Sequence, residues 1–322
     1  MLDKVNRPLR YLITGGAGFI GLAFTKLLVR NYPESKIVIF DKLSYAAQYD
    51  EIVKLLENTQ IEFVKGDISD FNLSLSVMHG VDVVVNFAAE SHVDRSISDS
   101  IPFVKSNALG VQVLLECALK AKVKIFIQVS TDEVYGSINS GSWNEFSLLE
   151  PNSPYSASKA SGDLLALAFY KTHGLDIRIT RCSNNYGPGQ HHEKLIPKSI
   201  ESIIKSKPIE IYGNGNNLRE WIHVEDHCRA IMKVIEKGSA GNIYNIGSNI
   251  ERSNNEIALA LIEIAKPNFS GSIVYIEDRK GHDQRYSLNC TKMSNLGFFP
   301  EIEFEFGLKQ TFDWYKSKLV NS

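Results

Sequence analysis

The stretch Leu9-Arg-Tyr-Leu-Ile-Thr-Gly-Gly-Ala-Gly-Phe-Ile-Gly21 joins an apolar run to a cluster of glycines. Residues 9–14 have the composition of a β-strand, and residues 21–31 have the apolar spacing of an α-helix. The glycines between them include the spacing G-x-G-x-x-G, which ends at Gly21. Glycine permits a tight turn and lets a pyrophosphate approach the backbone at the start of a helix. The stretch therefore predicts a strand–turn–helix unit that binds a dinucleotide.

The second expected strand, residues 36–41, ends on Asp41, at the position of a ribose-binding carboxylate. A carboxylate accepts hydrogen bonds from the ribose hydroxyls and repels a 2′-phosphate. The sequence therefore favours NAD over NADP as the cofactor. Lys42 works against this preference, because a neighbouring cation tolerates a phosphate.

Small or polar residues follow the later strands, where a cofactor would pass. Asp67 and Ile68 are expected beside the adenine ring, although a turn cap is an equal alternative for Asp67. Asn107 is expected as a polar prop beneath the site, with helix capping or solvation as alternatives. The full set of expected cofactor contacts is Gly15, Gly18, Phe19, Ile20, Gly21, Asp41, Lys42, Asp67, Ile68, Ala88, Ala89, Asn107, Tyr155 and Lys159.

Short β-branched runs alternate with helical stretches through the first part of the chain. The expected strands are residues 9–14, 36–41, 61–65, 81–87, 124–130 and 175–180. Runs this apolar, separated by helices, predict an α/β fold with a doubly wound parallel sheet of the Rossmann type. We expect an NAD-binding domain at 1–187 and a smaller mixed α/β substrate-binding lobe at 188–322, with segments near 220–250 returning to the first domain.

Composition excludes several classes of function. The formal net charge of −2 and the pI near 6.5 give no reason to expect nucleic-acid or anionic-membrane binding. The four cysteines are widely spaced, which predicts buried free thiols and no metal site. Residues 1–7 carry no apolar signal segment, and no run is long enough to span a membrane. We therefore expect a cytoplasmic protein.

Two helical stretches carry apolar faces that two readings explain equally well. Residues 104–121 and residues 154–173 have helical periodicity, and together they are a candidate bundle for a homodimer. In the first stretch the apolar face consists of Ala108, Val111, Leu114, Leu115 and Ala118. The alternative is that these faces simply pack on the sheet.

Tyr155 and Lys159 lie four residues apart at the start of an expected helix. Ser153 and Pro154 precede or open that helix as N-cap and first helical residue. The spacing i,i+4 puts the phenol and the ammonium on one helix face. A positive charge favours the phenolate, so the pair predicts the base of an oxidoreductase.

The triplet Thr131-Asp132-Glu133 ends the expected strand 124–130, where parallel strands open into an active-site cleft. Adjacent residues of a strand point to opposite faces, so Asp132 and Glu133 can meet one substrate only if the chain turns there. By themselves the two carboxyls fit a solvated strand end. Beside Tyr155 and Lys159, they predict acid–base chemistry with separated pKa values.

At this point the chain resembles the extended short-chain dehydrogenase/reductase superfamily, and within it the nucleotide-sugar 4,6-dehydratases of the dTDP-glucose 4,6-dehydratase type. The glycine cluster and Y-x-x-x-K mark only the superfamily, whereas the Thr-Asp-Glu triplet with Ala89-Glu-Ser-His-Val-Asp94 is more specific. The other matching segments are 14–21, 41–46, 88–96, 130–136, 155–159, 181–188, 194–197, 219–227 and 281–286.

The resemblance implies that oxidation at C4 of a hexose makes the C5 proton acidic, so that water can be lost across C5–C6. It implies that Tyr155 takes the proton of the 4-hydroxyl group and that Thr131 holds the C4 oxygen. It also implies that Lys159 lowers the pKa of Tyr155. Glu133 would remove the C5 proton, and a protonated Asp132 would donate to the leaving 6-hydroxyl. The cofactor would end unchanged and stay bound.

The resemblance also places the nucleotide sugar in the second lobe, with Arg219 and Arg279 on the diphosphate because guanidinium forks match phosphate oxygens. A surface salt bridge is the rival reading for each arginine. The full set of implied substrate contacts is Ser91, Asn184, Lys194, Leu195, Tyr212, Arg219, Asn254, Arg279 and His282. Glu220, His223 and Lys280 depart from the family pattern, so UDP-glucose is an alternative to dTDP-glucose.

Three other functions were weighed against dehydration. A nucleotide-sugar 4-epimerase would share Tyr155 and Lys159 but needs no acid for C6. A nucleotide-sugar decarboxylase would not need Asp132 to expel a hydroxyl. A non-catalytic NAD-binding scaffold is the alternative from another class, and the presence of all five catalytic residue types argues against it.

Overall fold

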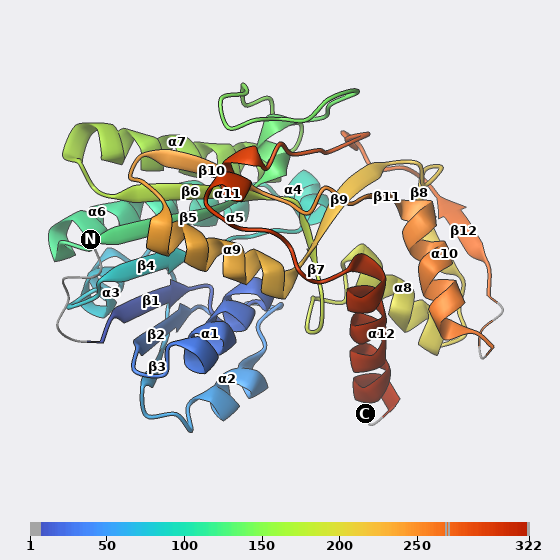
Figure 1. The fold of residues 1–322 in the computed structure, drawn as a ribbon, viewed down its shortest axis with the longest axis horizontal. Helices are drawn as coiled ribbons and strands as arrows, with labels where there is room; N and C mark the ends of the chain where they lie inside the picture. The colour runs from blue at the N-terminus through green and yellow to red at the C-terminus, as the bar shows by residue number, and fades with distance from the viewer. Residues whose placement is uncertain (1–7, 268, 270, 321–322) are drawn as a thin grey trace.

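The computed structural model describes residues 8–267, 269 and 271–320, and a parallel sheet of seven strands forms its centre (Figure 1). The strand order is β10-β6-β5-β4-β1-β2-β3, and every neighbouring pair is parallel. The strands are β1 (Arg10–Thr14), β2 (Lys36–Asp41), β3 (Ile61–Lys65), β4 (Val83–Asn86), β5 (Ile125–Thr131), β6 (Ile177–Cys182) and β10 (Asn242–Ile246). The predicted doubly wound sheet is confirmed. Residues 1–7, which were expected to carry no apolar signal segment, lie outside the described residues.

Helices cover both faces of this sheet. One face carries α1 (Phe19–Asn31) and α9 (Val224–Lys237), and the other carries α3 (Phe71–Val77), α6 (Val111–Ala121) and α7 (Pro154–His173). Alternate residues of one strand enter the two cores: Tyr11 and Ile13 join the first, and Leu12 joins the second. The strands are apolar throughout because both of their faces are buried.

The helix that carries Tyr155 and Lys159 begins as the sequence predicted. Ser153 is the N-cap of α7, and its side chain accepts a hydrogen bond from the backbone N–H of Ser156 at 3.1 Å. Ser156 accepts in turn from the backbone N–H of Ser153 at 3.0 Å. This reciprocal cap fixes the first turn of the helix, and therefore the direction in which Tyr155 points.

The stretch predicted as one helix over 104–121 is divided into three parts. It consists of α5 (Ile101–Val104), a π-helical segment η2 (Lys105–Gly110) and α6. Of the apolar face considered for a dimer bundle, Val111, Leu114, Leu115 and Ala118 lie in the core beneath the sheet. That stripe therefore packs within the chain. No described helix is long and apolar enough to cross a membrane.

A smaller lobe lies beyond the carboxyl ends of the strands (Figure 1). Its sheets are β11-β9-β7 and β12-β8. The strands are β7 (Asn184–Tyr186), β8 (Ile209–Tyr212), β9 (Leu218–His223), β11 (Glu251–Ser253) and β12 (Ile273–Ile276), and the helices are α8 (Leu195–Ile204), α10 (Asn254–Ala265) and α12 (Phe304–Val320). The remaining elements are α2 (Tyr49–Leu55), α4 (Val93–Ser98), η3 (Asp132–Tyr135) and α11 (Thr291–Asn295).

Because β10 pairs with β6, the chain returns to the main sheet after entering this lobe. The domain division at residue 187 stays a prediction.

Candidate active site

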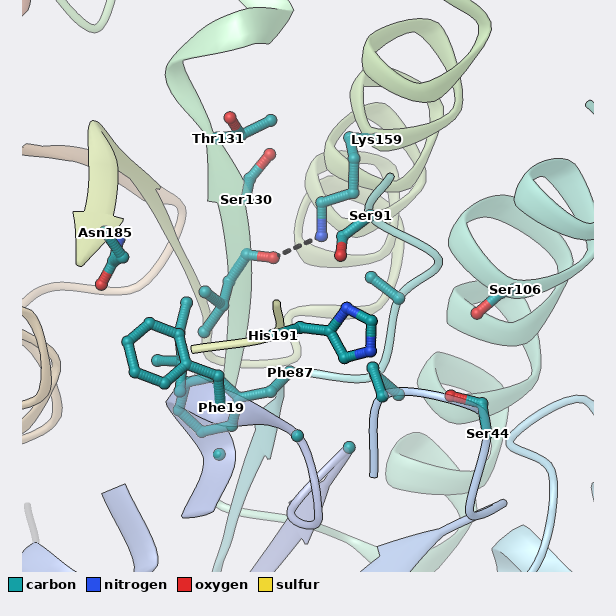
Figure 2. A pocket seen from close by; sticks show the side chains of 18 of the residues that line it. Phe19, Ser44, Phe87, Ser91, Ser106, Ser130, Thr131, Lys159, Asn185 and His191 are labelled. Atoms are coloured by element: carbon teal, nitrogen blue, oxygen red, sulfur yellow. Dashed lines mark hydrogen bonds between the residues drawn. The ribbon is translucent and has the colours of Figure 1, made fainter. Parts of the chain in front are cut away.

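A cavity opens at the carboxyl ends of β1, β2, β4 and β5 (Figure 2). Thirteen of the fourteen residues expected at the cofactor line it, and the exception is Asn107. The thirteen are Gly15, Gly18, Phe19, Ile20, Gly21, Asp41, Lys42, Asp67, Ile68, Ala88, Ala89, Tyr155 and Lys159. They come from segments spread over half of the chain, so the fold gathers them.

The glycine cluster lets neighbouring backbone segments pack closely, because a side chain on Gly15 or Gly21 would collide with them. Gly15 has a φ of +65°, and a Cβ atom on it would lie 2.6 Å from the backbone nitrogen of Ala88. A Cβ atom on Gly21 would lie 2.4 Å from the carbonyl oxygen of Gly15. The start of α1 therefore stands open, with no acidic residue in its first turn. This cradle fits a pyrophosphate group, because a helix N-terminus attracts an anion.

Asp41 is held in place at the edge of this cradle. Its two carboxylate oxygens accept hydrogen bonds from the backbone N–H groups of Ala17, at 3.0 Å, and Leu43, at 2.7 Å. The ammonium of Lys42 pairs with Glu90 at 2.6 Å. Lys42 is thus already engaged by a carboxylate, which weakens its attraction for a 2′-phosphate. The site therefore fits an unphosphorylated ribose.

Asn107 lies behind the cavity wall, not at its surface. Its side chain is buried, and its oxygen accepts a hydrogen bond from the backbone N–H of Glu90 at 3.0 Å. Its nitrogen donates to the carbonyl of Glu90 at 3.0 Å and to the hydroxyl of Ser158 at 2.9 Å. Asn107 therefore fixes the loop after β4 to α7, as a polar prop does, and it has no place in the cavity lining.

Tyr155 and Lys159 both face the cavity from α7. The ammonium of Lys159 donates a hydrogen bond to the carbonyl of Val129 at 2.6 Å (Figure 2). Burial, followed by the negative charge of Glu133, raises the pKa of Tyr155 well above its usual value. Burial also lowers the pKa of Lys159. The tyrosine therefore needs a positive charge close by before it can act as a base.

The chain turns at the triplet Thr131-Asp132-Glu133, as it must if both carboxyl groups are to face one cavity. Strand β5 ends at Thr131, and the 3-10 helix η3 begins at once with Asp132. The hydroxyl of Thr131 accepts from the backbone N–H of Glu133 at 3.3 Å and donates to Asp132 at 3.1 Å. The other oxygen of Asp132 is buried without a hydrogen-bond partner in the described residues. Both carboxyl groups therefore reach the cavity lining.

The two neighbouring carboxyl groups have different surroundings. Burial, then the charges of Glu133 and Glu220, raises the pKa of Asp132 well above its usual value. Burial also raises the pKa of Glu133, but the cations Lys194, Arg219 and Arg279 oppose that rise. Asp132 therefore holds its proton more strongly than Glu133 does. This is the arrangement of one acid beside one base.

A second cavity opens in the smaller lobe. Eight of the nine expected substrate residues line it, namely Asn184, Lys194, Leu195, Tyr212, Arg219, Asn254, Arg279 and His282, while Ser91 lines the first cavity. The two cavities share Glu133, Asn184, Gln190 and Lys194. A ligand in the second cavity can therefore reach Glu133 at the junction, while Asp132 lines the first cavity.

Both cations and carboxylates line this second cavity, with four lysine and arginine side chains among six aspartate and glutamate side chains. The guanidinium of Arg219 lies 4.3 Å from the ring centre of Tyr286 and donates to the carbonyl of Asp283 at 2.8 Å. Arg279 lies over the ring of Tyr212 at 5.3 Å, and its Nε is buried without a partner among the described residues. Arg279 also forms an ion pair with Asp94 at 3.5 Å, as the salt-bridge alternative predicts. Arg219 contacts carbonyls and a ring, which leaves its charge available to an anion.

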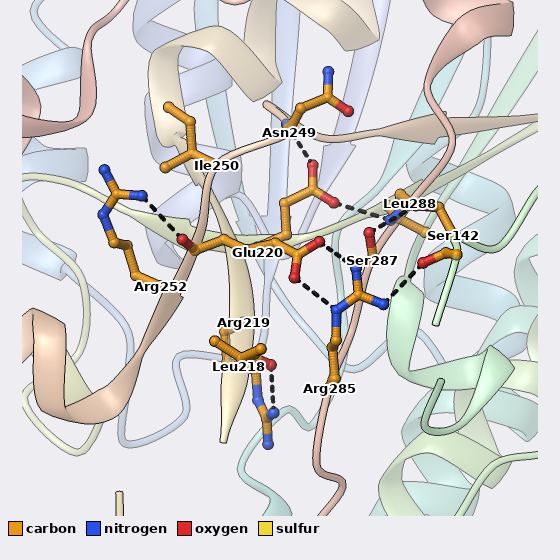
Figure 3. Close-up of polar contacts among 12 residues, drawn as sticks. Ser142, Leu218, Arg219, Glu220, Asn249, Ile250, Arg252, Arg285, Ser287 and Leu288 are labelled. Atoms are coloured by element: carbon orange, nitrogen blue, oxygen red, sulfur yellow. Dashed lines mark hydrogen bonds and ion pairs between the residues drawn. The ribbon is translucent and has the colours of Figure 1, made fainter. Parts of the chain in front are cut away.

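Glu220 holds the smaller lobe together and lines neither of these two cavities. Figure 3 shows its carboxylate accepting hydrogen bonds from the backbone N–H groups of Asn249, at 2.8 Å, and Leu288, at 2.9 Å. Beside it, Arg285 pairs with Glu251 through two bonds of 2.7 and 2.6 Å. This departure from the family pattern is therefore explained by loop anchoring.

Several lining residues were not anticipated from the sequence. His191 projects into the first cavity (Figure 2), and Gln190 donates to the carbonyl of Asn185 at 2.7 Å. In the second cavity, Asp94 accepts from the hydroxyl of Tyr212 at 3.3 Å. Gln190 and His191 lie in a loop without a periodic pattern, and Asp94 lies on the short helix α4. Their only signal was their place beside segments that carried the resemblance.

Comparison with known proteins gives full-length matches. The family model for GDP-mannose 4,6 dehydratase matches residues 12–311. A dTDP-glucose 4,6-dehydratase of Streptomyces griseus is 48% identical, over 94% of this chain and 93% of its own length. One from Streptomyces niveus is 46% identical, over 96% and 93%.

A solved structure gives the same result in three dimensions. The dTDP-glucose 4,6-dehydratase DesIV from Streptomyces venezuelae, crystallised with NAD, superposes with a TM-score of 0.94 at 47% identity. The match covers 97% of this chain and 98% of that one. The resemblance expected from the sequence is therefore confirmed, and this chain belongs to the GDP-mannose 4,6 dehydratase family.

Proposed function

We propose that this protein is an NAD-dependent 4,6-dehydratase that converts dTDP-glucose into its 4-keto-6-deoxy sugar. The observation that carries the proposal is that Glu133 lies where the two cavities meet, while Asp132 and Tyr155 line the first of them. A dehydrogenase needs only the tyrosine, whereas an elimination needs an acid and a base as well. Relatives named for this activity, at 46% identity and above over nearly the whole chain, support the substrate.

NAD supplies a hydride acceptor for C4 of the sugar and a hydride donor for C6. We propose that the cradle of Gly15, Gly18 and Gly21 holds its pyrophosphate, with backbone N–H groups of Phe19 and Ile20 directed at the phosphates. Asp41 would bind the adenosine ribose. The other first-cavity contacts would be Lys42, Asp67, Ile68, Ala88, Ala89, Tyr155 and Lys159.

The protons move through the residues of the triplet and α7. Tyr155 takes the proton of the 4-hydroxyl while Thr131 holds the C4 oxygen. Glu133 removes the C5 proton, which the new C4 ketone has made acidic. Asp132 gives its proton to the 6-hydroxyl, which leaves as water. Return of the hydride to C6 and of a proton to C5 would complete the cycle, so that its net redox change is zero.

The substrate nucleotide would lie along the second cavity. We propose that Arg219 and Arg279 bind the diphosphate, since a guanidinium forms paired bonds with phosphate oxygens. Asn184 and Lys194, at the junction, would contact the sugar or its phosphate. The remaining proposed contacts are Ser91, Leu195, Tyr212, Asn254 and His282.

The alternatives fit the site less well. A 4-epimerase has no use for a buried Asp132 whose pKa is raised well above its usual value. A decarboxylase would act on a uronic acid, which loses its carboxylate as carbon dioxide. It would therefore not need Asp132 to expel a hydroxyl group. A scaffold would not need pKa values that differ between neighbouring carboxyls.

We propose a cytoplasmic homodimer. All four cysteines, Cys117, Cys182, Cys228 and Cys290, are buried free thiols, which supports a reducing compartment. Four apolar side chains that are more than half exposed lie on α5, η2 and α7, which pack on one another; they are Ile101, Val104, Leu109 and Leu164. Their grouping supports pairing with a second copy of the chain.

The activity is tested with the purified protein and no added NAD. Incubation with dTDP-glucose should give a 4-keto sugar, seen by its absorbance in alkali, because retained cofactor is restored in each cycle. UDP-glucose is the matched comparison and should turn over more slowly. A galactose-configured product without keto sugar would indicate an epimerase, and no turnover would indicate a scaffold.

Asp132→Asn should separate oxidation from elimination. Without the acid, product formation should fall about 100-fold or more, while reduced nicotinamide still accumulates. In D₂O the C5 proton should still exchange, because Glu133 remains. Glu133→Gln is the matched variant and should abolish that exchange. If Asp132→Asn dehydrates at the wild-type rate, the assignment of the acid is wrong.

The same Asp132→Asn change should stabilise the protein, and more so as pH rises. The folded state holds a proton on Asp132 above the usual pKa of 3.8, where the unfolded chain has released it. Wild-type stability is therefore lost as pH rises through that window, by about 1.4 kcal/mol per pH unit. Denaturant unfolding at several pH values measures the difference in free energy of unfolding between the variant and the wild type. This difference should be smallest near pH 3.8, the usual pKa of the carboxyl group. A difference that shrinks with pH contradicts the proton on Asp132.

Leu164→Asp should convert the dimer into a monomer, because it places a charge in the proposed apolar contact. Sedimentation velocity measures the mass. Leu259→Asp is the control, since Leu259 is as exposed, at 57% against 58%, but lies on α10. A wild-type monomer, or a dimer that survives in the Leu164 variant, would overturn the proposed interface.

A further inference from the structure

Asp163 and Arg181 form a fully buried ion pair between α7 and β6. The guanidinium Nε lies 2.9 Å from a carboxylate oxygen, and the side chains are 0% and 2% exposed. A buried pair is expensive to desolvate, and apolar residues can often replace it without loss of stability. Packing alone therefore does not account for this pair.

Asp163 lies one helical turn after Lys159, so the two side chains share a face of α7. One carboxylate oxygen of Asp163 binds Arg181, and the other is buried with no hydrogen-bond partner among the described residues. The carboxylate thus keeps unshared negative charge on the helix face that also carries Lys159. It is this charge that opposes the effect of burial on Lys159.

Arg181 connects the same pair to the turn that carries the acid and the base. Its guanidinium lies 4.7 Å from the ring centre of Tyr135, the last residue of η3. The hydroxyl of Tyr135 donates to Asn245 of β10 at 2.8 Å. In the sheet, Arg181 lies opposite Ser130, one residue before Thr131. A displacement of Arg181 would therefore move η3.

We propose that Asp163 and Arg181 are positioning residues for the dehydration: Asp163 keeps Lys159 charged, and Arg181 holds Asp163 in place while it fixes the turn at Asp132 and Glu133. The inference rests on the proposed function. A charged lysine matters here because Tyr155 is buried and next to Glu133, and both effects oppose its ionisation.

Other groups around Lys159 do not replace Asp163. On β6, burial raises the pKa of Cys182 to about 12, so that this thiol stays neutral. On η3, burial and the neighbouring carboxylates raise the pKa of Asp132 well above its usual value, and Glu133 faces the cations of the second cavity. On its own helix the neighbour is Tyr155, whose ionisation the lysine must support. Asp163 is therefore the buried anion that favours the charged lysine.

The test is the pH profile of kcat for 4-keto sugar formation in Asp163→Asn and in the double variant D163N/R181M. Without Asp163, Lys159 loses its proton at lower pH, so the alkaline limb should move down by about one pH unit or more. The double variant removes both charges and should keep the wild-type Tm. Asp176→Asn is the control, because Asp176 pairs with Arg178 of the same strand at 2.8 Å but lies away from Lys159.

A second measurement does not depend on turnover. The ¹³C resonance of the Lys159 side chain, assigned with Lys159→Arg, reports its protonation directly and should titrate at lower pH in both Asp163 variants. If the double variant folds with a wild-type titration and a wild-type alkaline limb, the pair is merely structural and the proposal fails. If wild type makes no 4-keto sugar but the lysine titration still shifts, the proposed function fails while the electrostatic role of Asp163 stands.

Discussion

The site depends on one constraint, which is the abrupt end of β5. The strand is buried on both faces up to Thr131, and the chain then tightens at once into the 3-10 helix Asp132–Tyr135. A strand that continued would send the two carboxyl groups to opposite faces of the sheet. The turn brings both to the cavity, and the hydroxyl of Thr131 caps it through the backbone of Glu133.

Burial then gives these groups their chemical characters. In a medium of low polarity a charge is stable only beside an opposite charge or with hydrogen bonds. Burial and nearby carboxylates raise the pKa of Asp132 well above its usual value, whereas Lys194, Arg219 and Arg279 oppose the rise in the pKa of Glu133. Those cations belong to the smaller lobe or to the segment that leads into it. The lobe that is proposed to bind the anionic substrate therefore also supplies the positive charges that act on Glu133.

Buried polar contacts hold these parts in register. Asn107 fixes the loop after β4 to α7, and Glu220 anchors two loops of the smaller lobe by their backbone N–H groups. The Asp163–Arg181 pair joins α7 to β6 and reaches η3 through Tyr135. Because an unpaired buried polar group is costly, each contact tolerates little displacement. The elements that carry the base, the acid and the lysine are thereby tied to one another.

The sequence by itself determined the sheet, the glycine turn and the pairing of Tyr155 with Lys159, because strand burial and helical spacing are local patterns. It also required a turn at Asp132–Glu133. Only the tertiary structure decided that the stripe at Leu114 packs inward, that Asn107 lies behind the wall, and that Gln190 and His191 enter the cavity. Periodicity shows that a face is apolar but not what covers it. Loop positions and buried charges such as Arg181 depend on contacts between distant segments, which no local pattern encodes.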